Sequence, residues 1–169
     1  VKNNIKVCID AYKRNSAGRL NHILFVGPSG SGKTTLSKII AAEMGTDITE
    51  FMGPQVTLDS LKILQHQYTD SILFIDEVHA IPLKVEEALY SAMEDFLWLG
   101  KKIPQFTLIG ATTKEGFLSK PFHSRFGIIE TLGLYTLEEL QMMVEHSAAK
   151  LNVSITKDAV KDIATRSRG

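Results

Sequence analysis

The sequence predicts a three-layer α/β fold with a central parallel sheet. Residues 22–27 and 71–75 are short apolar runs without polar alternation, which is typical of strands buried on both faces. Segments with apolar residues at helical spacing lie between such runs. Alternating strands and helices of this kind pack as helices on both faces of a parallel sheet.

Composition narrows the class of protein. The chain has 169 residues, 19 basic and 19 acidic side chains, and 44% hydrophobic residues. This is enough apolar material for a buried core, and the zero net charge gives no bulk signal for a nucleic-acid or acidic-membrane partner. Cys8 is the only cysteine, which excludes an internal disulfide, and the five histidines lack metal-ligand spacing. No apolar run approaches the roughly 18 residues of a membrane span, so we expect a cytoplasmic protein without a membrane partner.

The first elements follow from local patterns. Apolar residues at helical spacing predict an opening helix up to about residue 12, and residues 22–27 predict the first strand. A helix is expected after the glycine-rich loop, ending at Gly45, because glycine readily adopts the left-handed conformation that ends helices. Residues 48–52 predict a second short strand, and residues 57–67 are polar and compatible with a helix.

The middle of the chain continues the alternation. Residues 71–75 predict a third strand, and Pro82 favours the start of an amphipathic helix that we expect to run to Gly100. Residues 105–113 and 127–133 predict two more strands, which completes the sheet.

The last part of the chain is expected to be helical. Thr136 and Glu139 have the spacing of a capping box, and Thr156 repeats the N-cap signal for a second helix. The sequence therefore predicts an α/β domain over residues 1–134 and the start of a small helical domain over residues 135–169.

A phosphate-binding loop follows the first strand. Residues 27–34, GPSGSGKT, match the pattern G-x-x-x-x-G-K-[ST] at every fixed position, and this full match disfavours a mere surface turn. Glycines let backbone N–H groups surround phosphate oxygens, the lysine reaches the β- and γ-phosphates, and the threonine ligates Mg²⁺. We expect ATP and Mg²⁺ as cofactors, with nucleotide contacts from Gly27, Pro28, Gly30, Ser31, Gly32, Lys33, Thr34 and Thr35.

Asp76 and Glu77 follow the third strand directly, at the carboxyl edge where open parallel sheets bind ligands. Together with the upstream loop they form a Walker B motif rather than a solvated strand end. Asp76 is expected to hold Mg²⁺ alongside Thr34, and Glu77 to orient and deprotonate the attacking water.

The residue types and their positions do not decide the roles of Thr112 and Thr113, of Arg125 or of His79. Thr112 and Thr113 end a strand, where a hydroxyl can contact the γ-phosphate or its attacking water but can equally be solvated. Arg125 is either a surface charge or a group that stabilises transferred charge in a neighbouring subunit. His79 completes D-E-V-H, which superficially fits a helicase superfamily with tandem motor domains, but 169 residues leave no room for the second. We interpret His79 as a residue behind the site or on the surface.

The motifs VGPSGSGKTTL, ILFIDEVHAI, VEEALYSAMEDF, FTLIGATTK and SRFGI resemble those of the AAA+ ATPases, and most closely the RuvB family of bacterial Holliday-junction branch-migration motors. The similarity follows the family's order over essentially the whole chain. It implies an ATP-hydrolysing ring, expected to be a hexamer, that acts on junction DNA in recombination and repair. It also implies that Thr113 is sensor 1 and Arg125 an arginine finger acting in trans. Further nucleotide contacts implied by the resemblance are Glu94, Asp95, Phe96 and Tyr135.

The resemblance has three gaps. The β-hairpin with which the family docks onto its partner RuvA is reduced here to residues 97–105, so the resemblance does not extend to this route of RuvA binding. His123 stands where the family usually has an additional arginine, which weakens the positive charge offered to a neighbour unless His123 is protonated. The family's adenine-contacting segment, sensor 2 arginine and DNA-binding winged helix have no counterpart in this sequence, so we expect the chain to be part of a longer protein.

Two alternative functions remain at this point. The short hairpin leaves room for another AAA+ role, such as a clamp-loader-like or phage replication ATPase. A nucleotide-binding module without useful turnover is the other, and the presence of Lys33, Asp76, Glu77 and Arg125 argues against it.

Overall fold

Five parallel strands form the central sheet, in the spatial order β2-β3-β6-β1-β7. The computed structural model describes residues 2–14, 20–66 and 70–167. The strands are β1 (Ile23–Val26), β2 (Ile48–Met52), β3 (Ser71–Asp76), β6 (Phe106–Thr112) and β7 (Ile128–Thr131). Four of them lie within the runs in which the sequence predicts strands, and β3 extends one residue beyond its predicted run, to Asp76.

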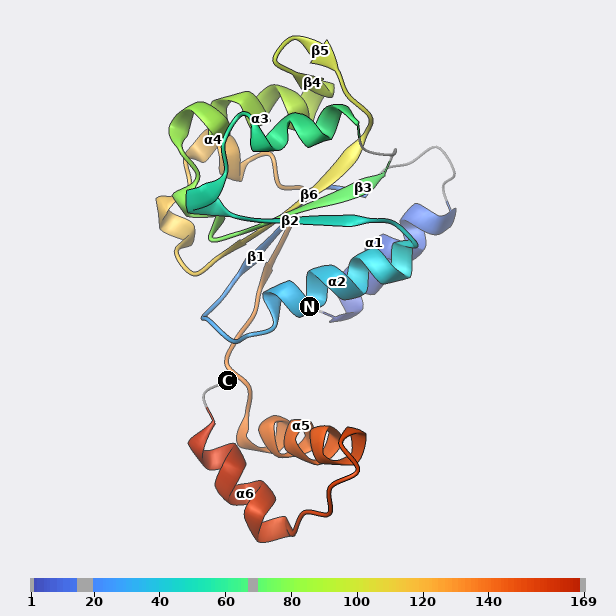
Figure 1. Ribbon diagram of the computed structural model, residues 1–169, viewed down its shortest axis with the longest axis vertical. Coiled ribbons are helices and arrows are strands. Elements are labelled where there is room, and N and C mark those ends of the chain that lie inside the picture. The colour runs from blue at the N-terminus through green and yellow to red at the C-terminus, as the bar shows by residue number, and fades with distance from the viewer. Residues whose placement is uncertain (1, 15–19, 67–69, 168–169) are drawn as a thin grey trace.

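Helices cover both faces of this sheet (Figure 1). The side chains of Ile23 and Phe25 on β1 pack in the same cluster as α1 (Lys2–Arg14) and α2 (Lys33–Met44). Leu24, between them, belongs to the cluster on the other face, under α3 (Leu83–Asp95). Because successive strand residues point to opposite faces, a continuous apolar run fills both layers. The predicted three-layer α/β fold is confirmed.

Helix α3 ends earlier than the sequence predicts. Phe96 has a left-handed backbone with φ 54°, which stops the helix, so the expected continuation to Gly100 is wrong. Instead β4 (Leu97–Trp98) and β5 (Lys101–Lys102) pair antiparallel as a small hairpin. Its turn has positive φ at both central residues, and Trp98 is fully buried. The buried indole of Trp98 packs on the core and holds the hairpin in place. Helical periodicity in the sequence does not reveal this contact.

Short helices complete the α/β part. Over residues 57–67, where the sequence indicates a helix-competent segment, the structure has a 3₁₀ helix, Ser60–Gln65, and residue 67 lies outside the described part. The polar stretch before β7 contains α4 (Lys120–His123), which the sequence did not predict. Among the helices described, none is long and apolar enough to cross a membrane.

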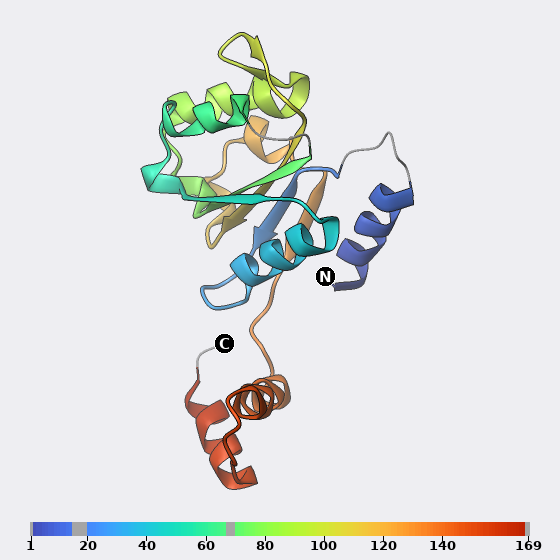
Figure 2. The ribbon, with the colours of Figure 1, turned by 45° about the vertical axis from the view of Figure 1, so that its right-hand side comes forward.

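Two helices follow β7 as a separate pair, α5 (Leu137–Lys150) and α6 (Lys157–Arg166), joined to the sheet by an extended segment (Figures 1 and 2). The predicted capping box is confirmed: the Thr136 hydroxyl accepts the Glu139 N–H at 3.2 Å, and the Thr136 N–H donates to the Glu139 carboxylate at 2.8 Å. The Thr156 hydroxyl caps α6 in the predicted way.

Candidate nucleotide-binding site

The loop that joins β1 to α2 closes around the ammonium group of Lys33. Gly30 and Gly32 have φ of 81° and 90°, a left-handed conformation that glycine adopts without strain. The Lys33 side chain is buried, and its Nζ donates to the carbonyl oxygens of Gly27 and Pro28 at 2.8 Å each. The loop thus places a buried positive charge next to the N-terminus of α2, where the helix dipole also favours an anion.

The start of this loop, Gly27, packs between the end of β6 and the residue that follows β7. The Gly27 N–H donates to the carbonyl oxygen of Thr112 at 3.0 Å. A Cβ at Gly27 would lie 2.4 Å from the carbonyl oxygen of Leu132, so the close approach requires glycine. The first residue of the phosphate loop is therefore hydrogen-bonded to the end of β6 and packed against the segment after β7.

The acidic pair lies where β3 ends. The Glu77 N–H donates to Oδ1 of Asp76 at 2.9 Å, and Glu77 itself has a left-handed backbone with φ 49° and ψ 47°. A Cβ at Gly53 would lie 2.2 Å from the Glu77 carbonyl oxygen, so the end of β2 packs tightly against this turn. The left-handed backbone of Glu77 is strained because Glu77 is not a glycine, and such strain persists where the surrounding structure enforces it.

The carboxylate of Glu77 is held by two side chains. Thr113 Oγ1 donates to Glu77 Oε2 at 3.1 Å, and His79 Nδ1 lies 3.1 Å from the same oxygen. The same Nδ1 lies 2.9 Å from Thr112 Oγ1, which in turn accepts the Lys114 N–H. Thr113 therefore contacts the candidate base, whereas Thr112 is buried behind it.

The phosphate loop and the acidic pair line the same cavity, which has a volume of about 280 Å³. Its lining consists of Ser29, Gly30, Gly32, Lys33, Thr34, Thr35, Asp76 and Glu77. Thr34 and Asp76 also line an adjoining cavity, so a hydroxyl and a carboxylate share one space. Among the described residues no group of three or more His, Cys, Asp or Glu side chains is arranged to hold a metal ion. The Thr34 hydroxyl and the Asp76 carboxylate fit Mg²⁺, which takes oxygen ligands and completes its shell with water and phosphate oxygens.

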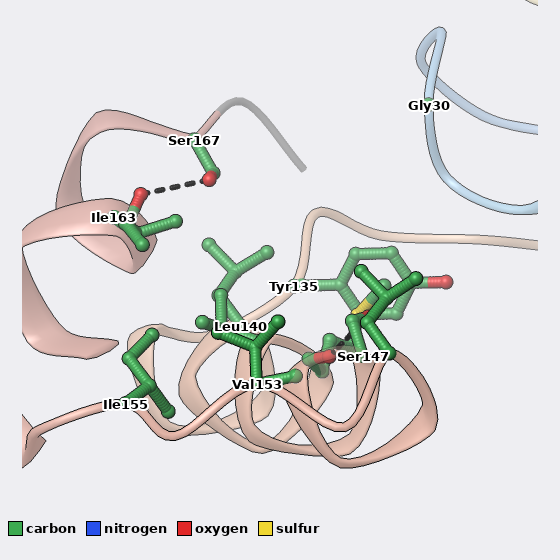
Figure 3. A pocket seen from close by; sticks show the side chains of 12 residues that line it. Gly30, Tyr135, Leu140, Ser147, Val153, Ile155, Ile163 and Ser167 are labelled. Carbon is green, nitrogen blue, oxygen red and sulfur yellow. Dashed lines mark hydrogen bonds between the residues drawn. The ribbon is translucent and has the colours of Figure 1, made fainter. Parts of the chain in front are cut away.

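Tyr135 connects the helix pair to the phosphate loop. Its hydroxyl donates to the carbonyl oxygen of Ser31 at 3.1 Å. An adjacent cavity of about 460 Å³, largely apolar, lies between this loop and the helices (Figure 3). Its lining includes Gly30, Tyr135, Leu140, Met143, Val144, Ser147, Ala148, Leu151, Val153, Ile155, Ile163 and Ser167. An apolar wall beside a phosphate loop suits the flat base of a nucleotide.

Arg125 lies far from this cleft. It precedes β7, whose first residue Ile128 is in register with Ile23 at the start of β1, so it is at the amino edge of the sheet. The phosphate loop leaves β1 at the opposite, carboxyl edge. The guanidinium contacts α3 instead, with Nη2 3.1 Å from the Glu94 carboxylate. The guanidinium therefore does not reach the phosphate loop of the same chain.

Comparison with known proteins identifies the family. The family described as Holliday junction DNA helicase RuvB P-loop domain matches residues 1–132, and the family described as RuvB AAA lid domain matches residues 135–169. The chain belongs to the RuvB family. Its nucleotide cleft is accordingly that of a P-loop ATPase domain, followed by a helical lid.

RuvB proteins of known sequence and structure are close relatives. Two proteins named Holliday junction branch migration complex subunit RuvB, from Latilactobacillus sakei subsp. sakei (strain 23K) and Campylobacter hominis, are 43% and 45% identical over the whole of this chain, which covers 54% of each. The structure of the Thermotoga maritima RuvB Holliday junction branch migration motor has a TM-score of 0.90 at 43% identity, over 98% of this chain and 55% of that one. The chain therefore spans about half the length of these relatives.

One group of residues that RuvB resemblance assigns to the nucleotide does not line the cleft. Glu94, Asp95 and Phe96 lie at the end of α3. The adjacent carbonyl of Met93 accepts a hydrogen bond at 3.1 Å from His22, which directly precedes β1. The end of α3 is thus at the amino edge of the sheet with Arg125, and the structure does not bring these three residues to the phosphate loop of the same chain.

His79 lies behind the site, which is one of the two positions that the sequence interpretation allowed. Its ring does not line the phosphate cleft, but Nδ1 lies 3.1 Å from the carboxylate of Glu77, which does. The sequence did not reveal this contact, because it depends on the turn after β3 and on the placement of β6 beside that strand.

Proposed function

We propose that this chain is the Mg²⁺-dependent ATP-hydrolysing module of a Holliday-junction branch-migration motor, with residues 1–134 as the ATPase domain and residues 135–169 as the start of its lid. The observation that carries the proposal is the meeting of Lys33, Asp76 and Glu77 in one cleft, with Glu77 held by Thr113. Membership of the RuvB family supports junction DNA as the substrate of the motor.

The residues divide the chemistry of hydrolysis. Lys33 and the loop N–H groups bind the β- and γ-phosphates, and Thr34 and Asp76 hold Mg²⁺, which neutralises charge on the transferred phosphoryl group. Glu77 accepts a proton from the attacking water as its oxygen bonds to the γ-phosphorus. The bond from the γ-phosphorus to the bridging oxygen breaks, so the products are ADP and phosphate. Thr113 orients the Glu77 carboxylate for this step.

The position of Arg125 supports a ring of subunits, expected to be a hexamer. At the amino edge of the sheet its guanidinium cannot serve its own nucleotide, but it can meet the carboxyl edge of a neighbouring subunit. In this arrangement Arg125 is an arginine finger acting in trans, and turnover depends on assembly. Docking of RuvA through the β4–β5 hairpin is not part of the proposal, because each hairpin strand has only two residues.

Two substitutions test the site. Glu77→Gln is expected to bind ATP with unchanged affinity and to lose turnover by about 10²- to 10⁴-fold, because the amide cannot accept the proton. Lys33→Ala is expected to lose affinity for ATP, since it removes the buried charge from the loop. Lys84→Ala, at an exposed lysine of α3, is the control that leaves both quantities unchanged. ATP binding is measured by titration and turnover by phosphate release. Retained turnover in Glu77→Gln contradicts the assignment of the base.

A further inference from the structure

Three side chains of α3 form a stripe that faces α4. Glu86, Tyr90 and Glu94 recur at every fourth position and therefore lie along one side of the helix. The Tyr90 hydroxyl donates to Glu86 Oε1 at 2.7 Å and lies 3.0 Å from Ser119 Oγ. Ser119 also donates to the buried Glu86 carboxylate and caps α4 by accepting the Phe122 N–H. The first two members of the stripe thus fix the start of α4, the helix that leads to Arg125.

The last two members hold Arg125 itself. Nη2 of Arg125 lies 3.1 Å from Glu94 Oε2, and the guanidinium carbon lies 4.4 Å from the centre of the Tyr90 ring. Nη1 donates to the carbonyl oxygen of Pro121 at 2.6 Å. Only 17% of the side chain is exposed, and its Nε is buried with no hydrogen-bond partner among the described residues. The contacts with Glu94, Tyr90 and Pro121 therefore hold this rotamer even though one donor is unsatisfied.

The Tyr90 ring is suited to this contact. Burial, and then the hydrogen bond with Glu86, raise the pKa of Tyr90 above its usual value of 10.0, so the phenol is neutral at physiological pH. A neutral ring presents its negative face to the guanidinium in a cation–π contact. Glu94 adds an opposite charge, and its side chain is more than half exposed to solvent.

We infer that Glu94 is a positioning residue that presents the Arg125 guanidinium to a neighbouring subunit. The inference rests on the proposed trans role of Arg125. A free arginine side chain samples many rotamers, and ordering it at each turnover costs entropy. A finger that Glu94 already orders meets the phosphate of a neighbour without this loss. The inference also gives Glu94 a function that requires no contact with a nucleotide.

The first test compares kinetic constants in the assembled protein. Glu94→Ala is expected to lower kcat by roughly 10- to 30-fold, which corresponds to the rotamer entropy of one long side chain. ATP affinity stays unchanged, because the residue lies at the opposite edge of the sheet from the phosphate loop. Glu94→Gln, which keeps the length and an acceptor oxygen, is expected to lose less. Glu87→Ala, at an exposed carboxylate of the same helix, is the matched control. An unchanged or raised kcat in Glu94→Ala overturns the inference.

The second test assigns Glu94 to one side of the subunit interface by mixing variants. An interface is active when one subunit supplies an intact Glu77 and its neighbour an intact finger. Mixing Glu94→Ala with Glu77→Gln is expected to raise turnover several-fold above that of either variant alone. Mixing Glu94→Ala with Arg125→Ala is expected to give no gain, because every finger side is then defective. A gain in this second mixture places Glu94 with its own nucleotide and overturns the inference.

A reference mixture separates this inference from the proposed function. Arg125→Ala mixed with Glu77→Gln tests only whether the finger acts in trans. If demonstrably mixed rings show no gain there, the trans role of Arg125 fails, and the proposed catalysis between subunits fails with it. If that reference mixture gains activity while Glu94→Ala with Glu77→Gln does not, the trans role stands and only the role of Glu94 is wrong.

Discussion

Replacing His79 tests whether the contacts around the candidate base matter for hydrolysis. In the structure the Glu77 carboxylate accepts a hydrogen bond from Thr113 Oγ1 at 3.1 Å, and His79 Nδ1 lies 3.1 Å from the same carboxylate oxygen. A hydrogen bond to a charged group contributes about 1.5–3 kcal/mol, and each 1.4 kcal/mol changes a rate about tenfold. His79→Ala removes one of these two polar contacts to the carboxylate. We therefore expect kcat to fall by about 10- to 150-fold, with ATP affinity unchanged because His79 does not line the phosphate cleft.

The assay is phosphate release at saturating ATP, combined with ATP titration. His79→Asn is the conservative variant, because its amide can donate from nearly the position of Nδ1, and we expect it to recover part of the lost kcat. His66→Ala, at an exposed histidine outside the site, is the control and should behave as the parent protein does. An unchanged kcat in His79→Ala would refute the reasoning, since Thr113 alone would then suffice to hold Glu77.

Two further substitutions test the packing of the phosphate loop. Gly27→Ala places a Cβ 2.4 Å from the Leu132 carbonyl oxygen and is expected to lower the free energy of unfolding by about 1–3 kcal/mol, measured by chemical denaturation. Gly116→Ala, whose Cβ would meet nothing within 4 Å, should stay near the parent value, and equal effects of the two would contradict the steric account. Tyr135→Phe removes the hydrogen bond to Ser31, and we expect its loss to raise the Kd for ATP about 2- to 10-fold, measured by titration. An unchanged Kd would show that this contact does not support the loop.

Local patterns predicted most of the sheet and the ends of several helices. The inner strands β1 and β3 follow continuous apolar runs, since a strand covered on both faces has no polar side. The helix stop at Gly45 and the capping box of Thr136 with Glu139 depend on neighbours along the chain, so the sequence alone reveals them. The end of α3 at Phe96 was missed, because burial of Trp98 on the core decides it and helical periodicity carries no record of that contact.

Some features of the candidate site could likewise be predicted from the sequence, and others could not. The loop around Lys33 and the pair of Asp76 and Glu77 were predictable, because each is a contiguous motif with a fixed chemical requirement. The contact of His79 with Glu77 and the seat of Arg125 depend on which strands and helices lie side by side, so they emerge only in three dimensions. The choice between Thr112 and Thr113 is of this kind as well. Which of the two hydroxyls contacts Glu77 depends on the placement of β3 beside β6.

The proposed catalysis between subunits of a ring that acts on junction DNA can be measured as ATP turnover per subunit while protein concentration rises, with and without a four-way DNA junction. We expect a specific activity that rises with concentration, because the proposed role of Arg125 is in a neighbouring subunit, and a further increase when the junction is added. A specific activity that is independent of concentration and unaffected by the junction, in protein shown to bind ATP, would contradict it.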